Sequence, residues 1–165
     1  MNIKHERRKT PCRRRGLAAV EIACGSLFLC VFLLLAIDVS ILMLGYEVND
    51  KACRDACRAA AQQSSPAEAI TAAQAILKTH QTDGNFVTQP TMVTGAGNFQ
   101  YQDFGGNPLA GNPTVTVTTE CRVKTPVPLV FVGNNFGHDG GWVNDYWTFR
   151  KKYTFPIVTF TLQLP

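Results

Sequence analysis

The chain has 165 residues and a formal net charge of +4 at pH 7, a size that allows one modest domain and an additional segment. Seven basic residues and one acid, Glu6, precede Leu17, so the first 16 residues carry +6 and the remainder carries −2. This excess is confined to a short leader, which argues against a nucleic-acid-binding protein.

An almost wholly apolar run follows the basic leader directly. Residues 17–44 contain only two charged side chains, Glu21 and Asp38. The stretch 17–37 makes about 31 Å of helix, which matches the roughly 30 Å hydrocarbon core of a bilayer. It is longer than the apolar core of a secretory signal, about 7–15 residues. The pattern predicts a retained transmembrane helix with Asp38 in water at its outer end.

The basic leader sets the expected orientation, because positive residues flanking a span stay on the cytoplasmic side. We therefore expect residues 1–16 in the cytoplasm and everything after residue 44 outside. Glu21 lies one turn inside the cytoplasmic edge, where a buried charge is costly. Two interpretations of Glu21 stay open: its side chain reaches back toward the headgroups, or it has a charged partner.

The junction between leader and apolar run reads RRRGLAAVE over residues 13–21. It resembles the processing site of type IV prepilins, in which a membrane peptidase cuts after a glycine and a glutamate becomes the fifth mature residue. By this resemblance, the cut follows Gly16, Leu17 becomes the new N-terminus, and Glu21 pairs with the Leu17 ammonium of its own or a neighbouring subunit.

Over residues 13–63 the chain is similar to the TadE-like pseudopilin family of tight-adherence pilus systems. The resemblance implies a minor pilin-like subunit or assembly factor in the inner membrane. Its implied partners are membrane lipid, other pilin-like subunits and a prepilin peptidase. The alternative is a single-pass envelope protein with an external binding or scaffolding domain and no filament role.

The helical pattern continues beyond the apolar run. Two i,i+4 pairs with the acid first, Glu47–Lys51 and Asp50–Arg54, favour a helix here. Small and polar residues recur at 4-3-4-3-4 spacing and form a seam: Gly45, Asn49, Ala52, Ala56, Ala59 and Gln63. Such a seam allows close approach of another element. That element is either the chain's own domain or another subunit.

Three cysteines, Cys53, Cys57 and Cys121, lie in the part expected to reach an oxidising compartment. A bond between Cys53 and Cys57 would strain a regular helix. Three interpretations stay open: a bridge from Cys53 or Cys57 to Cys121, buried core thiols, or a bridge between chains. No histidine is near the first two cysteines, so the sequence predicts no metal site there.

The start of a second helix is indicated by three residues: Ser65 as N-cap, Pro66 as the first helical residue and Glu68 as the acid of a capping box. The predicted second helix runs to about His80, which suits a helix C-terminus. Asp83-Gly84 ends it. The predicted extracytoplasmic helices therefore span residues 45–82.

Residues 83–165 change in character and predict strands. Residues 114–124 alternate, with Val115, Val117, Cys121 and Val123 on the buried face. Further strands are expected at 86–88, 99–104, 129–132 and 158–164, the last one limited by Pro156. The predicted fold class is α+β: a long N-terminal transmembrane helix that continues outside, then a small antiparallel sheet.

Catalytic chemistry is not indicated. The chain has no hydrolase, nucleotide or dinucleotide motif and no serine after Ser65, so we expect no enzyme and no cofactor. The glycine-rich residues 133–141 do not match a calcium-binding loop. We expect an exposed loop there that contacts a partner through Phe136 and Trp142.

Overall fold

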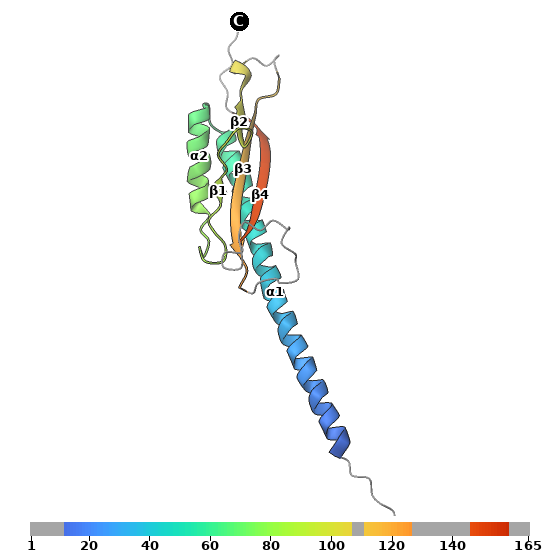
Figure 1. Cartoon of the computed structure of the whole chain (residues 1–165). Coiled ribbons are helices and arrows are strands. Elements are labelled where there is room, and N and C mark those ends of the chain that lie inside the picture. Colours follow the sequence, from blue (N-terminus) through green and yellow to red (C-terminus); the bar gives the residue numbers. More distant parts are fainter. Residues whose placement is uncertain (1–11, 107–110, 127–145, 159–165) are drawn as a thin grey trace, which may run out of the picture. The chain divides into compact units, whose positions relative to one another are not determined.

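The computed structural model describes residues 12–106, 111–126 and 146–158, with side chains from Gly16 onward. Its elements in chain order are α1 (Cys12–Ala61), α2 (Pro66–Thr79), β1 (Thr91–Met92), β2 (Phe99–Gln102), the short 3-10 helix η1 (Phe104–Gly106), β3 (Thr114–Lys124) and β4 (Tyr146–Pro156) (Figure 1). The chain divides into two compact units, Met1–Ile37 and Asp38–Pro165. The predicted α+β class is confirmed.

Helix α1 is continuous over 50 residues. No proline lies between residues 12 and 65, so nothing in the sequence interrupts its hydrogen-bond ladder. Within the described residues it is the one helix long and apolar enough to cross a bilayer. In the first unit, eleven of its large apolar side chains are exposed by 42% or more, from Leu17 to Ile37.

The sheet of the second unit is antiparallel and is centred on β3. Along one side β3 pairs with all of β4, from Thr114 opposite Pro156 to Lys124 opposite Tyr146. Along the other side it pairs with β2 and then with β1, and an isolated bridge joins Val87 to Val123. The antiparallel sheet that the sequence predicts is therefore confirmed.

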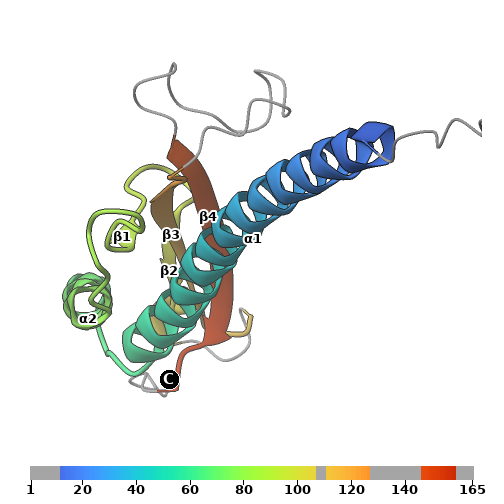
Figure 2. The same cartoon turned by 90° about the horizontal axis from the view of Figure 1, so that it is seen from below.

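The second half of α1 packs on one face of this sheet, and α2 lies beside it, next to β1 (Figures 1 and 2). The main core combines small residues of both helices with apolar residues of β3, so the helices approach the strands closely. Its fully buried members include Ala52, Ala56, Ala69, Val115 and Val117.

A second, smaller core cluster lies at the end of β3 nearest Asp38. It contains Val87, Cys121 and Val123, with Ile41 and Leu42 of α1 packed against them. The folded unit thus includes α1 from Asp38 onward. Asp38 itself is 0% exposed, so the prediction that its carboxylate reaches water is wrong. Asp38 is the first residue of the second unit, so its side chain is buried where the folded unit begins.

The last described strand also differs from expectation. Pro156 ends β4, opposite Thr114, instead of preceding a strand. Val158 is not in a strand, and the rest of the predicted strand 158–164 lies outside the described residues. The predicted strand 129–132 and the loop 133–141, with Phe136, lie outside them too, as does Trp142. The predicted 99–104 strand is found as β2 but ends at Gln102, because the chain turns into η1 at Phe104, and 86–88 contributes the bridge at Val87.

Candidate functional site

The resemblance to prepilins directs attention first to Gly16, Leu17 and Glu21. All three lie on the exposed part of α1 in the first unit, and Leu17 is 76% exposed. No atom lies within 4 Å of a methyl group built on Gly16. Glu21 follows Leu17 by about 6 Å along the helix axis. No described side chain forms an ion pair with Glu21, and the junction is open to a partner.

The small-residue seam of α1 faces the chain's own sheet. Gly45, Asn49, Ala52 and Ala56 are buried, while Ala59 and Gln63 are half-buried. A methyl group at Gly45 would lie 2.2 Å from Cγ2 of Val123, so only glycine allows this approach. The structure therefore favours packing within the chain as the role of this seam.

One polar side chain of the seam is buried and hydrogen-bonded through both its nitrogen and its oxygen. The Nδ2 atom of Asn49 donates to the carbonyl of Phe149 at 2.8 Å, and its Oδ1 accepts from the Thr119 hydroxyl at 2.8 Å. Because a buried amide is costly unless its donors and acceptors are paired, these bonds fix the position of α1 over β3 and β4.

The three cysteines of the folded unit are buried thiols. The Cys53 sulfur lies 3.5 Å and 3.4 Å from the carbonyl oxygens of Val117 and Lys151, and Cys57 contacts the carbonyls of Val115 and Tyr153 in the same way. Burial raises the pKa of Cys53, and it raises that of Cys57 to about 11. These thiols fill space between helix and sheet and are poor nucleophiles.

Cys121 belongs to the smaller core cluster, and its sulfur donates to the carbonyl of Thr88 at 3.1 Å. Burial raises its pKa to about 11. The bridge predicted from Cys53 or Cys57 to Cys121 is not formed in this structure, because the sulfurs face different backbone segments. The interpretation as core thiols agrees with it.

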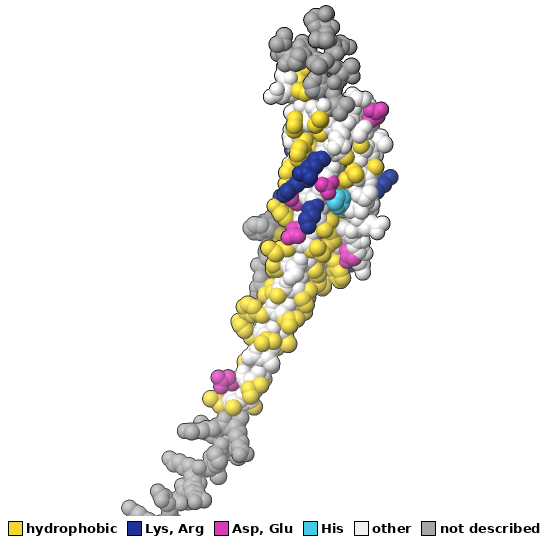
Figure 3. Space-filling view, turned by 180° about the vertical axis from the view of Figure 1, so that it is seen from behind, with side chains coloured by type: hydrophobic (Ala, Val, Ile, Leu, Met, Phe, Trp, Pro, Cys, Tyr) yellow, Lys and Arg dark blue, Asp and Glu magenta, His cyan; other side chains and the backbone are white. Residues whose placement is uncertain are grey.

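A charged network joins the exposed side of α1 to β4. The Tyr153 hydroxyl donates to Oδ1 of Asp50 at 2.7 Å, Arg54 pairs with the same carboxylate, and Lys151 lies 3.7 Å from it. The hydrogen bond from Tyr153 is the main cause that lowers the pKa of Asp50. Lys151 also donates to the Tyr46 hydroxyl. Figure 3 shows basic and acidic side chains gathered on the folded unit.

Sequence reasoning finds only part of this network. The pairs Asp50–Arg54 and Glu47–Lys51 are confirmed, the second at 3.9 Å. Tyr153 and Lys151 come from a strand about a hundred positions away, and no spacing rule connects them to Asp50. His80, directly after the end of α2, lies 3.3 Å from Asp55 of α1. This contact also joins residues that are distant in the sequence.

The predicted start of α2 is confirmed. Ser65 caps it and accepts from the Glu68 amide at 3.4 Å, with Pro66 as its first residue. Past its end, Asp83 accepts from the amides of Phe86 and Val87 at 3.0 Å and 2.9 Å. These two bonds lower the pKa of Asp83 and hold the loop that brings Phe86 to the end of β3.

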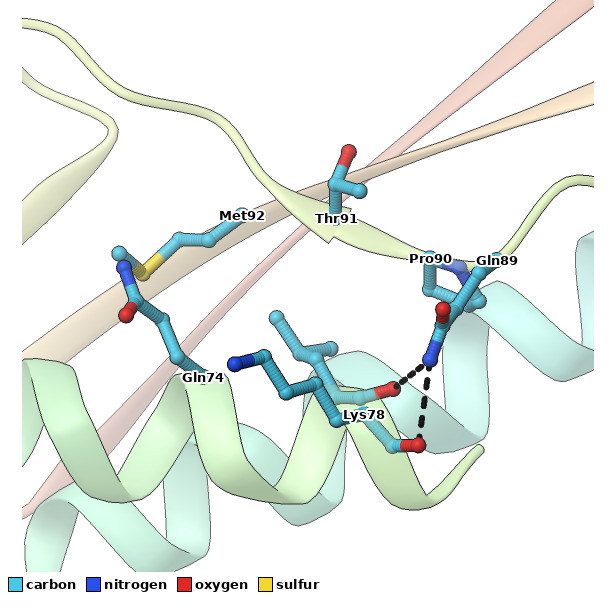
Figure 4. A pocket seen from close by; sticks show the side chains of 7 residues that line it. Gln74, Lys78, Gln89, Pro90, Thr91 and Met92 are labelled. Carbon is cyan, nitrogen blue, oxygen red and sulfur yellow. Dashed lines mark hydrogen bonds between the residues drawn. The ribbon is translucent and has the colours of Figure 1, made fainter. Parts of the chain in front are cut away.

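A shallow cavity of about 290 Å³ lies between α2 and the segment around β1 (Figure 4). Gln74, Leu77 and Lys78 line it from α2, and residues 89–92 line it from the other side. Gln89 donates to the carbonyls of Leu77 and Lys78, which occupies the polar end of the cavity. The lining brings together no nucleophile and general base, so it indicates binding at most.

Among the described residues, no three histidine, cysteine, aspartate or glutamate side chains come together as metal ligands. Comparison with known proteins adds no identity: no protein-family model, no curated protein and no solved structure matches the chain.

Proposed function

We propose that the chain is a membrane-anchored, pilin-like subunit or assembly factor of a tight-adherence pilus or a related secretion apparatus. One observation carries the proposal: a single helix exposes eleven large apolar side chains in its first part and provides the core of an α+β unit in its second part. Each such side chain costs about 1.5–3 kcal/mol when left in water, so this surface requires a lipid or protein environment.

The residues at the start of this helix support an assembly role. Glu21 places a carboxylate in an apolar surface, four residues after the open Gly16–Leu17 junction. An ammonium group created at Leu17, on its own or an adjacent helix, would offset the cost of that charge. The +6 leader keeps the N-terminus in the cytoplasm in this proposal, and the folded unit outside.

The test combines carbonate extraction of membranes with N-terminal sequencing of the full chain, produced with and without a prepilin peptidase. We expect a chain that resists extraction and begins at Leu17 only when the peptidase is present. Gly16→Glu should abolish processing. Gly25→Ala, at an equally open glycine of the same helix, is the matched control and should be processed normally.

Release of the chain by carbonate would overturn the anchored proposal. If the chain stays in the membrane but is never cut, the proposed processing step is wrong. The Glu21→Gln variant then tests the assembly role. An unchanged yield of pili with Glu21→Gln would favour the alternative, an anchored envelope protein whose external unit binds a ligand. The cavity between α2 and β1 is the observation that favours this second function.

A further inference from the structure

Apolar side chains remain exposed on α1 after the folded unit has begun. Met43 and Leu44 are 66% and 55% exposed, although they lie beyond Asp38, where this unit starts. Tyr46 follows at 46%, and the first exposed charge is that of Glu47. The outer surface of α1 therefore changes from apolar to charged about one helical turn after Leu44, inside the folded unit.

The sheet places two suitable side chains at the same level. Gly45 contacts Val123, and Lys124 follows Val123 in β3, at the same level as Gly45 but with its side chain on the outer face of the sheet. The amide of Lys124 donates to the carbonyl of Phe86 at 2.7 Å, which fixes Phe86 next to it. Phe86 is 39% exposed, and Lys124 is exposed. We name Met43, Leu44, Tyr46, Phe86 and Lys124 the proximal rim.

The charged side chains around the proximal rim favour the binding of an anionic group. On the outer face of the sheet, Arg122 and Arg150 share one carboxylate, that of Glu120, at 3.3 Å and 2.9 Å. Lys124 forms no ion pair with any described residue. Asp83, in the loop before Phe86, directs both carboxylate oxygens at backbone amides of its own loop and forms no ion pair with Lys124. Within the described part of the chain, the Lys124 ammonium therefore has no carboxylate partner.

We infer that the proximal rim binds the surface of the membrane, with Phe86 and Tyr46 at headgroup depth and Lys124 on anionic phospholipid headgroups. This inference rests on the proposed membrane anchoring. Aromatic residues are favoured at the interface between lipid and water, and a basic residue near an anionic surface adds about fivefold in affinity. The rim would hold the folded unit against the bilayer and limit its rotation.

The test places a photoreactive phenylalanine analogue at Phe86 in the full chain, reconstituted in nanodiscs of equal phosphatidylcholine and phosphatidylglycerol. Phe104 is the matched control, because it is also 39% exposed but lies at the opposite end of the sheet. Phe104 follows β2, whose last residue, Gln102, pairs with Thr114, about 34 Å along β3 from Lys124. We expect lipid adducts at position 86 and almost none at position 104.

Headgroup selectivity is read from the same adducts by mass spectrometry. At position 86, adducts with phosphatidylglycerol should outnumber those with phosphatidylcholine by about five to one, and Lys124→Gln should remove this enrichment. Lys152→Gln is the control, because Lys152 pairs with Thr118, about 20 Å farther along β3. It should leave the enrichment unchanged.

Three results would overturn the inference: equal adducts at both positions, adducts at position 86 with protein only, or lipid adducts without selectivity. Adducts with protein would assign the rim to a partner chain. Carbonate extraction of cell membranes that contain the same chain separates this failure from failure of the proposed function. If the chain stays integral to the membrane but forms no lipid adduct at position 86, the rim contact is wrong and the membrane anchoring stands.

Discussion

The Thr119 hydroxyl donates a 2.8 Å hydrogen bond to the buried amide of Asn49 and thereby ties β3 to α1. Asn49→Ala leaves this hydroxyl without its acceptor, and we expect a loss of about 1–3 kcal/mol in the free energy of unfolding. The measurement is urea unfolding of the full chain in detergent, followed by tryptophan fluorescence. Gln63→Ala, two residues after the end of the same helix and half-buried, should cost less than about 0.5 kcal/mol.

A double-mutant cycle with Thr119→Val tests the pairing itself. The combined loss should be smaller than the sum of the two single losses, because each variant removes the same hydrogen bond. Strictly additive losses would show that Asn49 and Thr119 act independently.

Gly45 permits the closest approach between α1 and β3. A methyl group there meets Val123 at 2.2 Å, so we expect Gly45→Ala to lower the unfolding free energy by about 1–3 kcal/mol, despite the better helix propensity of alanine. Adding Val123→Ala should restore part of the loss. Gly25→Ala has open space around it and serves as the control in the same unfolding assay. Equal stability of the Gly45 and Gly25 variants would contradict the contact.

The Asp50 carboxylate gives the folded unit a defined acid sensitivity. Its pKa is lowered chiefly by the hydrogen bond from Tyr153, with Arg54 and Lys151 contributing, so the stabilisation is complete above the unfolded pKa of about 3.9. It is lost as the pH falls below that value through the folded pKa. Tyr153→Phe should therefore be less stable at pH 7 and lose less further stability between pH 5 and pH 2.

Tyr101→Phe is the matched control for this pH profile. The Tyr101 hydroxyl donates to the backbone carbonyl of Gln63 at 2.8 Å, and this acceptor does not titrate. Its removal should lower stability by a similar amount at every pH, about 0.5–1.5 kcal/mol. If wild type and Tyr153→Phe lost stability in parallel as the pH falls, the Tyr153 hydrogen bond would not be the cause of the lowered Asp50 pKa.

The thiols of Cys53, Cys57 and Cys121 should resist alkylation in the folded chain. With a pKa of about 11, Cys57 and Cys121 carry on the order of 0.1% thiolate at pH 8, against roughly a quarter for an ordinary cysteine. Peptide mapping after iodoacetamide treatment should find all three modified only when the chain is denatured. Rapid labelling of the native chain, or a bridged peptide under non-reducing conditions, would contradict the buried-thiol assignment.

Local signals in the sequence predict the elements whose causes are local. Ser65 and Pro66 predict the start of α2, and the alternation of residues 114–124 predicts β3. Both signals are local, because helix capping and strand pleating depend on only a few neighbouring residues. The face of β3 that holds Val115, Val117, Cys121 and Val123 is buried as predicted.

Elements that depend on distant partners are not found in this way. Strand β4 escapes prediction because Lys151 interrupts the apolar face formed by Trp147, Phe149, Tyr153 and Phe155. That lysine is accommodated by Asp50 and Tyr46 of α1, which lie about a hundred residues earlier. Asp38 is a similar case, since an acid at the end of an apolar run suggests water contact and only the fold buries it.

The start of the packed region at Asp38 determines where the chain can be shortened. A version that begins after Leu44, where the apolar run ends, would lack Ile41 and Leu42 and so would uncover Val87, Cys121 and Val123. Such a fragment should aggregate or fold poorly. A fragment that begins at Asp38 keeps this hydrophobic cluster closed and should leave the folded unit complete.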